Sequence, residues 1–385
     1  MKIGIDASRN RSGGAIVHII GILSEIETLP VEIKEVHIWS YRKLIDNLPD
    51  HNWLIKHPVA DLEKPLLNQL FWQYNCLSTE AKKYNIDIML NTNAGTLCRF
   101  HPSVTMSRSM LSYEKGEINR YGFGLERLRL FVLRYVQNYS LRNSEGVIFL
   151  TEYAAKVIQS YCGPLANFEI IPHGISKVFR IETNSGLWKK SDNEPVRCIY
   201  ISNVDLYKHQ WNVIKAINRL KHKGYNLSIL FVGGGSGPAQ KLFEKEFQSK
   251  NFDKEIVTQM EFIKQNEIPV LLKKSDIFIF ASSCENMPNT LIEGMAAGLP
   301  IACSDRGPMP EILKDGGIYF DPEKPDSIAN AIESIIENES TRLNIAKKAK
   351  ELSYQYSWSR CARETFSYLI NIHKVTNAMS FRKTS

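Results

Sequence analysis

The chain has 385 residues, and because single hydrophobic cores rarely grow past about 250–300 residues, this length predicts two domains. Hydrophobic residues make up 43% and charged residues 23%, values that are ordinary for a soluble globular protein. The net charge of +7 at pH 7 is mildly basic. It suits a phosphorylated ligand or an anionic membrane surface, and it is equally compatible with a solvated surface that has a small excess of Lys and Arg.

The seven cysteines are scattered, with no C-x-x-C pair and no His partner at metal-binding spacing, which predicts a reduced, cytosolic protein. The N-terminal sequence MKIGID carries Asp6 where a signal peptide would be apolar, so we expect a strand there and no targeting segment. No apolar run approaches the ~18 residues that a membrane span needs, so any membrane contact is expected to be peripheral.

The chain opens with a short apolar strand at residues 2–6, followed by Gly13 and Gly14 and by an amphipathic helix at residues 15–27. A strand, a glycine pair and a helix are typical of a doubly wound α/β domain. Glycines at this place let the backbone approach a ligand at the helix N-terminus. The alternative is a tight turn without a ligand.

Further apolar strands are predicted in the first half of the chain, with helices between them, and this alternation favours a parallel sheet. They span residues 36–40, 86–90, 104–107, 147–151 and 169–171. Ligands of such sheets collect beyond the carboxyl ends of the strands. The residues expected along this rim are Gly13, Gly14, Asn91, Asn93 and Arg108.

Residues 113–144 predict a basic amphipathic helix with interleaved aromatic side chains. Its arginines include Arg120, Arg127, Arg129 and Arg134. Such a helix can lie at an anionic membrane interface. It can also be an ordinary helix that packs on the core and has a charged outer face. Both interpretations can be correct, with one face of the helix on the core and another at the membrane.

A polar, turn-rich segment at residues 181–195 predicts the interdomain linker, which gives an N-terminal domain at 1–185 and a C-terminal domain at 190–358. The second domain repeats the pattern of strands and helices. Its strands are expected at 197–201, 227–232, 256–262, 277–281, 299–303 and 318–320, and its helices at 210–221, 268–273, from Pro288 onward and at 325–337. Two last helices, 341–354 and 359–375, lie outside the sheet pattern, and the tail from Thr376 is expected to fray.

Several catalytic and cofactor motifs are missing from the sequence. The glycine run that begins at Gly233 fails as a G-x-G-x-x-G dinucleotide fingerprint because residue 238 is proline. The chain has no G-x-x-x-x-G-K-[ST], no H-E-x-x-H and no G-x-S-x-G. It also has no D-x-D, which argues against a metal-bridged nucleotide-sugar site, so we predict no metal at the site.

What remains is a set of groups suited to a diphosphate. Lys208 follows a predicted strand, and the helix that begins near Pro288 would offer the backbone N–H groups of Met287, Asn289 and Thr290. A helix N-terminus with a lysine beside it can hold a pyrophosphate without metal.

Glu285 and Glu293 are acceptors suited to sugar and ribose hydroxyls, because one carboxylate takes two hydroxyl donors at fixed geometry. The alternatives are a helix-capping or surface carboxylate for Glu285 and a solvated helix residue for Glu293. Glu293 precedes the small residues Gly294, Ala296, Ala297 and Gly298, which indicate a closely packed helix.

The sequence from Glu285 to Ile301, E-N-M-P-N-T-L-I-E-G-M-A-A-G-L-P-I, resembles the E-x7-E signature of family 4 retaining glycosyltransferases, which have the GT-B fold. Three further segments fit: S-G-G at 12–14, I-P-H-G-I at 171–175 and G-P-M-P-E-I at 307–312. The segment M-L-S-Y-E-K-G-E-I-N-R-Y-G at 110–122 resembles bacterial members that build O-antigen or capsule polysaccharide.

The resemblance implies two Rossmann-like domains facing a cleft, with the C-terminal helix crossing back onto the first domain. It implies that Glu285 holds the donor sugar, Glu293 the ribose and Lys208 the diphosphate, with residues 260–263 flanking the base. Many members carry an arginine before that lysine, and Ser202 or Asn203 takes its place here. Many also carry a histidine in the first domain; Arg108 or Glu114 occupies that neighbourhood, and His101 is a weaker candidate.

The residues that we predict are grouped by role. We predict catalytic roles for Glu285, Lys208 and Arg108. We predict that the donor is bound by Gly13, Gly14, Ser202, Asn203, Lys208, Gly233, Phe262, Glu285, Asn286, Met287, Pro288, Asn289, Thr290 and Glu293. We predict that the acceptor or the membrane is contacted by Arg120, Arg127, Arg129 and Arg134.

The predicted function is the transfer of a hexose, with retention, from a nucleotide-diphosphate sugar to a lipid-linked glycan. The enzyme would lie at the inner face of the cytoplasmic membrane. No cofactor is expected beyond the co-substrate, for which GDP-mannose is weakly favoured over a UDP-hexose, and no nucleic-acid partner is expected. The alternatives are an epimerase or hydrolase of nucleotide sugars with the same fold, and a non-catalytic nucleotide-sugar or membrane-binding module.

Overall fold

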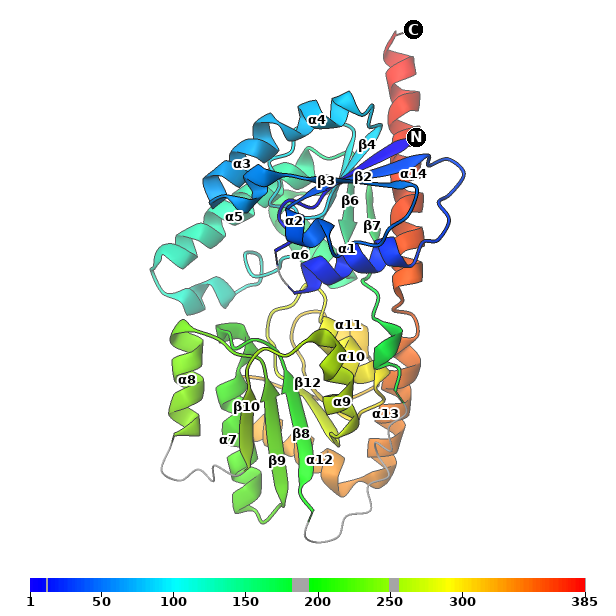
Figure 1. The fold of residues 1–385 in the computed structure, drawn as a ribbon. Helices are drawn as coiled ribbons and strands as arrows, with labels where there is room; N and C mark the ends of the chain where they lie inside the picture. The colour runs from blue at the N-terminus through cyan, green and yellow to red at the C-terminus, as the bar shows by residue number, and fades with distance from the viewer. Residues whose placement is uncertain (12, 182–193, 249–255, 385) are drawn as a thin grey trace. The chain divides into compact units, whose positions relative to one another are not determined.

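The computed structural model describes residues 1–11, 13–181, 194–248 and 256–384, with side chains up to Met379. The chain divides into two compact units, one of Met1–Gly174 with Tyr356–Ser385 and one of Ile175–Gln355 (Figure 1). The expected linker at 181–195 lies almost wholly outside the described residues.

The first unit is built on a seven-stranded sheet in which every pairing is parallel. Its strands, in the spatial order β3-β2-β1-β4-β5-β6-β7, are β3 Leu54–Pro58, β2 Glu35–Ser40, β1 Lys2–Asp6, β4 Ile88–Asn91, β5 Ser103–Met106, β6 Gly146–Phe149 and β7 Phe168–Ile170. The central strands are buried along their length, as expected where helices cover both faces of a parallel sheet.

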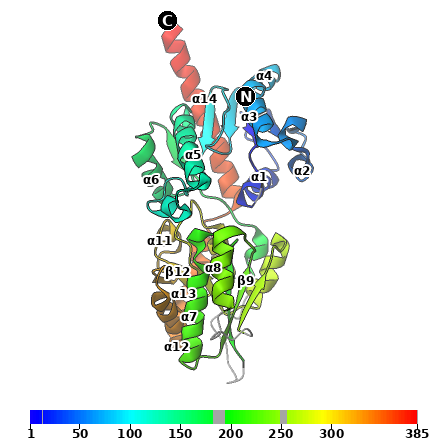
Figure 2. The same ribbon diagram turned by 90° about the vertical axis from the view of Figure 1, so that its left-hand side faces the viewer.

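Helices flank this sheet, with α1 and α2 on one side and α5 and α6 on the other (Figure 2). They are α1 Gly14–Ser24, α2 Arg42–Ile45, α3 Leu66–Asn75, α4 Leu77–Lys83, α5 Leu125–Arg142, α6 Glu152–Cys162 and α14 Trp358–Thr384. Although α14 ends the chain, it packs on α1 and β4. The backbone N–H of Val147 on β6 donates to the Tyr368 hydroxyl of α14, at 3.3 Å.

The second unit has a six-stranded sheet, again parallel throughout, in the order β10-β9-β8-β11-β12-β13. Its strands are β8 Val196–Ile201, β9 Leu227–Val232, β10 Val257–Met260, β11 Ile277–Phe280, β12 Ile301–Ser304 and β13 Ile318–Phe320. Its helices are α7 Gln210–His222, α8 Gly237–Phe247, α9 Ile268–Lys273, α10 Asn289–Ala296, α11 Met309–Leu313, α12 Pro325–Glu337 and α13 Glu339–Ser353.

Both sheets reverse their strand order once, between β1 and β4 in the first unit and between β8 and β11 in the second. At such a reversal the connections leave toward opposite faces, so a crevice opens beyond the carboxyl ends of the two strands. These two places are therefore where the fold puts ligands.

Three expectations about single elements are wrong. The helix expected at 113–144 begins only at Leu125, because Gly116 and Gly122 take positive φ angles of 89° and 60° around the short 3-10 helix Glu117–Tyr121. The sequence pattern predicts no element between residues 40 and 86, whereas the structure has α2, β3, α3 and α4 there. The tail does not fray at Thr376, since α14 contains no Gly or Pro to stop it and runs to Thr384.

Candidate functional site

Lys208 and Glu285 come together at the strand-order reversal of the second unit. Lys208 ends the short 3-10 helix Leu206–Lys208 after β8, and Glu285 lies in the loop after the neighbouring strand β11. The Lys208 ammonium donates to Glu285 Oε1, and the two side chains are 9% and 15% exposed. The sequence placed both residues in the site, and the fold joins them although they are 77 positions apart.

Aromatic rings and hydrogen bonds hold Lys208 in place. Its ammonium lies 5.0 Å from the centre of the Tyr207 ring and 5.6 Å from that of Phe280. The Tyr200 hydroxyl donates to the Lys208 carbonyl at 2.7 Å. Lys208 thus presents a fixed positive charge at the end of the sheet.

The loops after β8 and β11 are fastened to each other next to this pair. The backbone N–H of Ser283 donates to the Tyr207 carbonyl at 2.8 Å, and His209 Nε2 lies 2.9 Å from Ser283 Oγ. His209 takes the left-handed conformation, with φ of 51°, and so turns the chain into α7.

The glycine run after β9 lets two loops pack against each other. A Cβ on Gly233, whose φ is 126°, would lie 2.2 Å from the Ser202 carbonyl oxygen, and one on Gly235 would lie 2.6 Å from Val204 Cβ. The Val204 N–H donates to the Gly234 carbonyl at 3.0 Å. These glycines therefore serve the close approach of the segment 202–204.

Ser202 and Asn203, at the place of the family's usual arginine, are held by Gln210. The Gln210 Nε2 donates at 2.9 Å both to Ser202 Oγ and to the Asn203 carbonyl. Gln210 was not predicted for the site, because a glutamine at the start of a helix carries no sequence signal of this contact.

Glu293 lies on α10 with only 6% of its surface exposed. Its helix packs tightly, since a Cβ on Gly294 would lie 2.8 Å from the Phe278 ring. Glu293 Oε1 accepts from Gln265 Nε2 at 3.4 Å, whereas Oε2 is buried without a hydrogen-bond partner. Burial raises the pKa of this carboxyl to about 8. The alternative of a solvated surface residue is wrong, and the open oxygen is suited to a hydroxyl-bearing ligand.

The N-terminus of α10 follows Pro288, and no side chain caps it. One predicted donor is already engaged, because the Asn289 N–H bonds to the Met287 carbonyl at 3.0 Å. The Asn289 Oδ1 atom is buried without a partner, and Asn286 and Met287 are buried beside it. Thr290, in the first turn of α10, is half-buried.

The segment expected to flank a base follows β10. Phe262 is 90% exposed and Met260 is 38% exposed, and the Gly233 N–H ties this segment to the β9 loop through the Met260 carbonyl at 2.9 Å. An exposed ring beside the glycine run can stack on a planar ligand.

In the first unit, Gly13 and Gly14 stand where β1 leads into α1. Gly13 has a φ of 53°, and no atom lies within 4 Å of a Cβ placed on it, so its conformation requires glycine while its surroundings stay open. Ser12 lies outside the described residues.

The three candidates for the acceptor side are placed differently. Arg108 follows β5 at the carboxyl edge of the sheet, and burial lowers its pKa to about 10. Glu114 accepts from the Tyr153 hydroxyl at 2.7 Å, and burial raises its pKa. His101 precedes β5 and pairs with Glu145 at 3.0 Å. It therefore lies at the amino edge, away from the ligand rim, and the weaker candidate is wrong.

The arginines of the basic segment are engaged with neighbours on their own surface. Arg120 pairs with Glu117 and Arg129 with Glu126, each at 2.8 Å. Arg127 lies over Phe123 and Arg134 over Phe131, with guanidinium-to-ring distances of 4.7 and 5.1 Å. Large apolar side chains on this surface are exposed: Phe123, Leu125, Leu128, Val132, Tyr135 and Tyr139.

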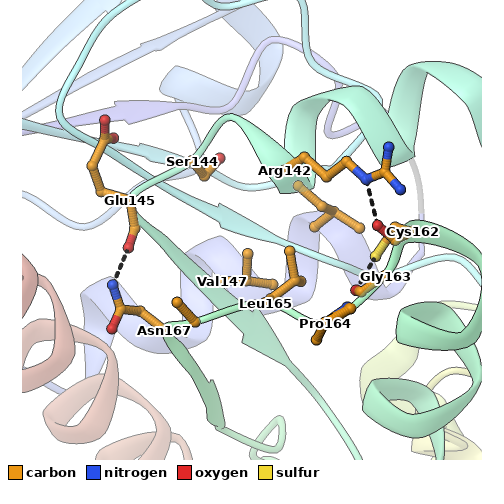
Figure 3. A pocket seen from close by; sticks show the side chains of 11 residues that line it. Arg142, Ser144, Glu145, Val147, Cys162, Gly163, Pro164, Leu165 and Asn167 are labelled. Atoms are coloured by element: carbon orange, nitrogen blue, oxygen red, sulfur yellow. Dashed lines mark hydrogen bonds between the residues drawn. The ribbon is translucent and has the colours of Figure 1, made fainter.

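A cavity of about 480 Å³ lies elsewhere in the first unit, at the amino ends of β6 and β7 (Figure 3). Within it, Arg142 Nε donates to the Cys162 carbonyl, and Asn167 Nδ2 donates to the Glu145 carbonyl at 3.1 Å. The cavity is at the opposite edge of the sheet from Arg108 and contains none of the predicted residues.

Part of the chain is similar in sequence to known glycosyltransferases. Residues 188–352 match the family model of glycosyl transferases group 1. An uncharacterized glycosyltransferase of Methanocaldococcus jannaschii is 32% identical over 129 residues, which cover 33% of this chain and 32% of that protein. The O-antigen chain mannosyltransferase B of Escherichia coli is 25% identical over 119 residues, 31% of this chain and 30% of that protein. The chain thus spans about a third of the length of these curated relatives.

The fold itself is shared over nearly the whole chain. The solved structure of HepE from Anabaena, in complex with UDP, has a TM-score of 0.72 and 17% identity, and the match covers 96% of this chain and 99% of that one. The predicted fold class, two Rossmann-like parallel-sheet units of the GT-B type, is confirmed. The similarity to the glycosyl transferases of group 1 lies in residues 188–352, which fall within the second unit.

Proposed function

We propose that the protein transfers a hexosyl group, with retention, from a nucleoside diphosphate sugar to a lipid-linked glycan in the synthesis of a surface polysaccharide. The observation that carries this proposal is the Lys208–Glu285 pair at the strand-order reversal of the unit that matches the group 1 family. GDP-mannose is the favoured donor, in line with the relative named as an O-antigen mannosyltransferase, and a UDP-hexose is the second candidate, since HepE was solved with UDP.

The chemistry follows from the charges of the site. Departure of the nucleoside diphosphate builds negative charge on its outer phosphate, and Lys208 with the uncapped N-terminus of α10 would stabilise that charge. Glu285 would then be free to accept hydrogen bonds from the hydroxyls of the donor sugar. Glu293 would receive the ribose hydroxyls at its unpartnered oxygen.

The acceptor would reach the protein at a membrane. No helix among the described residues is long and apolar enough to cross a bilayer. The exposed aromatic and cationic side chains of α5 and of the segment before it would instead lie on the anionic inner face of the cytoplasmic membrane.

The test is a nucleotide-release assay with a panel of nucleotide sugars, each with and without a lipid-linked glycan. We expect release that depends on the acceptor, is fastest with GDP-mannose, and yields a product with the anomeric configuration of the donor by NMR. Release without an acceptor would support the hydrolase alternative. Donor binding without release under any condition would support a non-catalytic module.

A further inference from the structure

Arg108 has no counter-ion among the residues that the structure describes. Its Nε and Nη1 atoms are buried and have no hydrogen-bond partner there. A guanidinium has five N–H donors and cannot be deprotonated at neutral pH. Leaving these donors unsatisfied costs free energy, and native proteins rarely do so without a reason.

The His18 side chain lies close enough to Arg108, within the same unit, to feel its charge. His18 on α1 is fully buried, and neither of its ring nitrogens has a hydrogen-bond partner. Its ring stacks on His173, with 4.6 Å between the ring centres, and lies 5.9 Å from the Trp358 ring of α14. Burial, His173 and the Arg108 charge, in that order, lower the pKa of His18, which is therefore a neutral imidazole with one N–H to donate.

In the described part of the chain, no carboxylate compensates the charge of Arg108. The neighbouring group that most favours the charged form of Arg108 is the Cys361 thiol of α14. Because burial raises the pKa of that thiol to about 12, the thiol is neutral and carries no compensating charge. Removing one partner from a buried ion pair is strongly destabilising because it leaves a buried charge without compensation. Without a bound anion, Arg108 is such an uncompensated buried charge. An incoming anion would supply the missing charge and accept the open hydrogen bonds.

We propose that Arg108, with His18 beside it, forms a phosphate-binding site in the first unit, separate from Lys208 in the second. The inference rests on the proposed function and deepens it: the phosphate belongs to the acceptor, as in a lipid diphosphate that carries a glycan. Arg108 then acts as a binding residue that fixes the acceptor, because a guanidinium cannot accept the proton of the attacking hydroxyl.

Thermal unfolding measures the site without any turnover. Inorganic phosphate and pyrophosphate are titrated against the Lys208→Gln variant, in which the other phosphate site is impaired. We expect both anions to raise its melting temperature progressively, because a ligand of the native state stabilises it. Adding Arg108→Gln should abolish this shift while leaving the melting temperature without anion equal or higher, since an uncompensated buried charge is removed.

Arg99→Gln is the matched control, because Arg99 is an exposed arginine of the same unit that lies over the Tyr74 ring. It should keep the anion-dependent shift. The proposal is overturned if the Lys208→Gln variant shows no shift up to tens of millimolar anion, or if Arg108→Gln keeps the shift.

Kinetics identify the source of the phosphate. We expect Arg108→Gln to raise the KM for the lipid diphosphate acceptor at least tenfold with the KM for the nucleotide sugar unchanged. A rise confined to the donor KM would overturn the assignment to the acceptor. Failure of the proposed function would look different: no nucleotide sugar would stabilise the wild-type protein, whatever the anion titration showed.

Discussion

Glu285 and Glu293 are eight residues apart, but they meet opposite environments. Glu285 is partly exposed and paired with the Lys208 ammonium. Glu293 is buried with one open oxygen, no cation among the described residues pairs with it, and its burial raises its pKa. The same side chain is thus an ion-pair partner at one position and a buried carboxyl group with a raised pKa at the other.

Replacing Glu293 by Gln should stabilise the free protein at alkaline pH. In the folded state Glu293 holds its proton up to about pH 8, whereas the unfolded chain releases it near pH 4.5, so wild-type stability falls as the pH rises between these values. Glu293→Gln should remove this part of the pH dependence, by on the order of a few kcal/mol at most. Denaturant unfolding at pH 5 and pH 8.5 measures the free energy of unfolding of both proteins. A pH dependence identical to that of the wild type would contradict the raised pKa of Glu293.

Lys208→Ala should lower kcat with the proposed donor by roughly 10²-fold or more, the usual loss when one group that stabilises transition-state charge is removed. The matched control is Lys223→Ala in the same unit, where an exposed lysine pairs with Glu333 at 2.8 Å. That surface pair should contribute under about 1 kcal/mol and leave kcat unchanged. Steady-state kinetics of both variants test the point, and equal rates would exclude Lys208 from the site.

The glycine run after β9 allows a test with a control in the neighbouring residue. Gly233→Ala would place a methyl group against the Ser202 carbonyl and force a positive φ, at a cost of about 1–3 kcal/mol. Gly234→Ala should be tolerated, since the nearest atom, Glu261 Cγ, lies 4.0 Å away. Thermal melts and donor titrations should show loss of stability and of donor affinity for Gly233→Ala alone.

Helix α5 joins exposed apolar side chains to arginines, and this combination is expected at a membrane interface. Reversing Arg127, Arg129 and Arg134 to Glu should cut binding to vesicles containing anionic lipid, with a smaller effect at high salt. The control makes the same charge change on α7, at Arg219, Lys221 and Lys223. Vesicle co-sedimentation measures both, and equal losses would show that only net charge matters.

Both units show the alternation of strands and helices that the sequence predicted, because the strands are continuous apolar runs. The sequence also predicted Lys208 and Glu285, since both follow strands at the carboxyl edge. It missed Gln210 and Gln265, whose contacts form only after folding and leave no local pattern. The sequence did not predict the elements between β2 and β4. One reason is that α3 has the apolar residues Leu66, Leu67 and Phe71 on its exposed side, so its apolar residues do not follow a clear helical period.

The positive groups of the second unit decide whether transfer needs a divalent metal. The sequence has no D-x-D, and the proposed diphosphate site draws its positive charge from Lys208 and from the N-terminus of α10. We therefore expect transfer to persist in EDTA at close to the untreated rate. It should weaken with rising salt, because an ionic contact to the diphosphate is screened. A rate that falls to background in EDTA and returns with Mn²⁺ or Mg²⁺ would show instead that a metal takes the place of the arginine that Ser202 or Asn203 replaces.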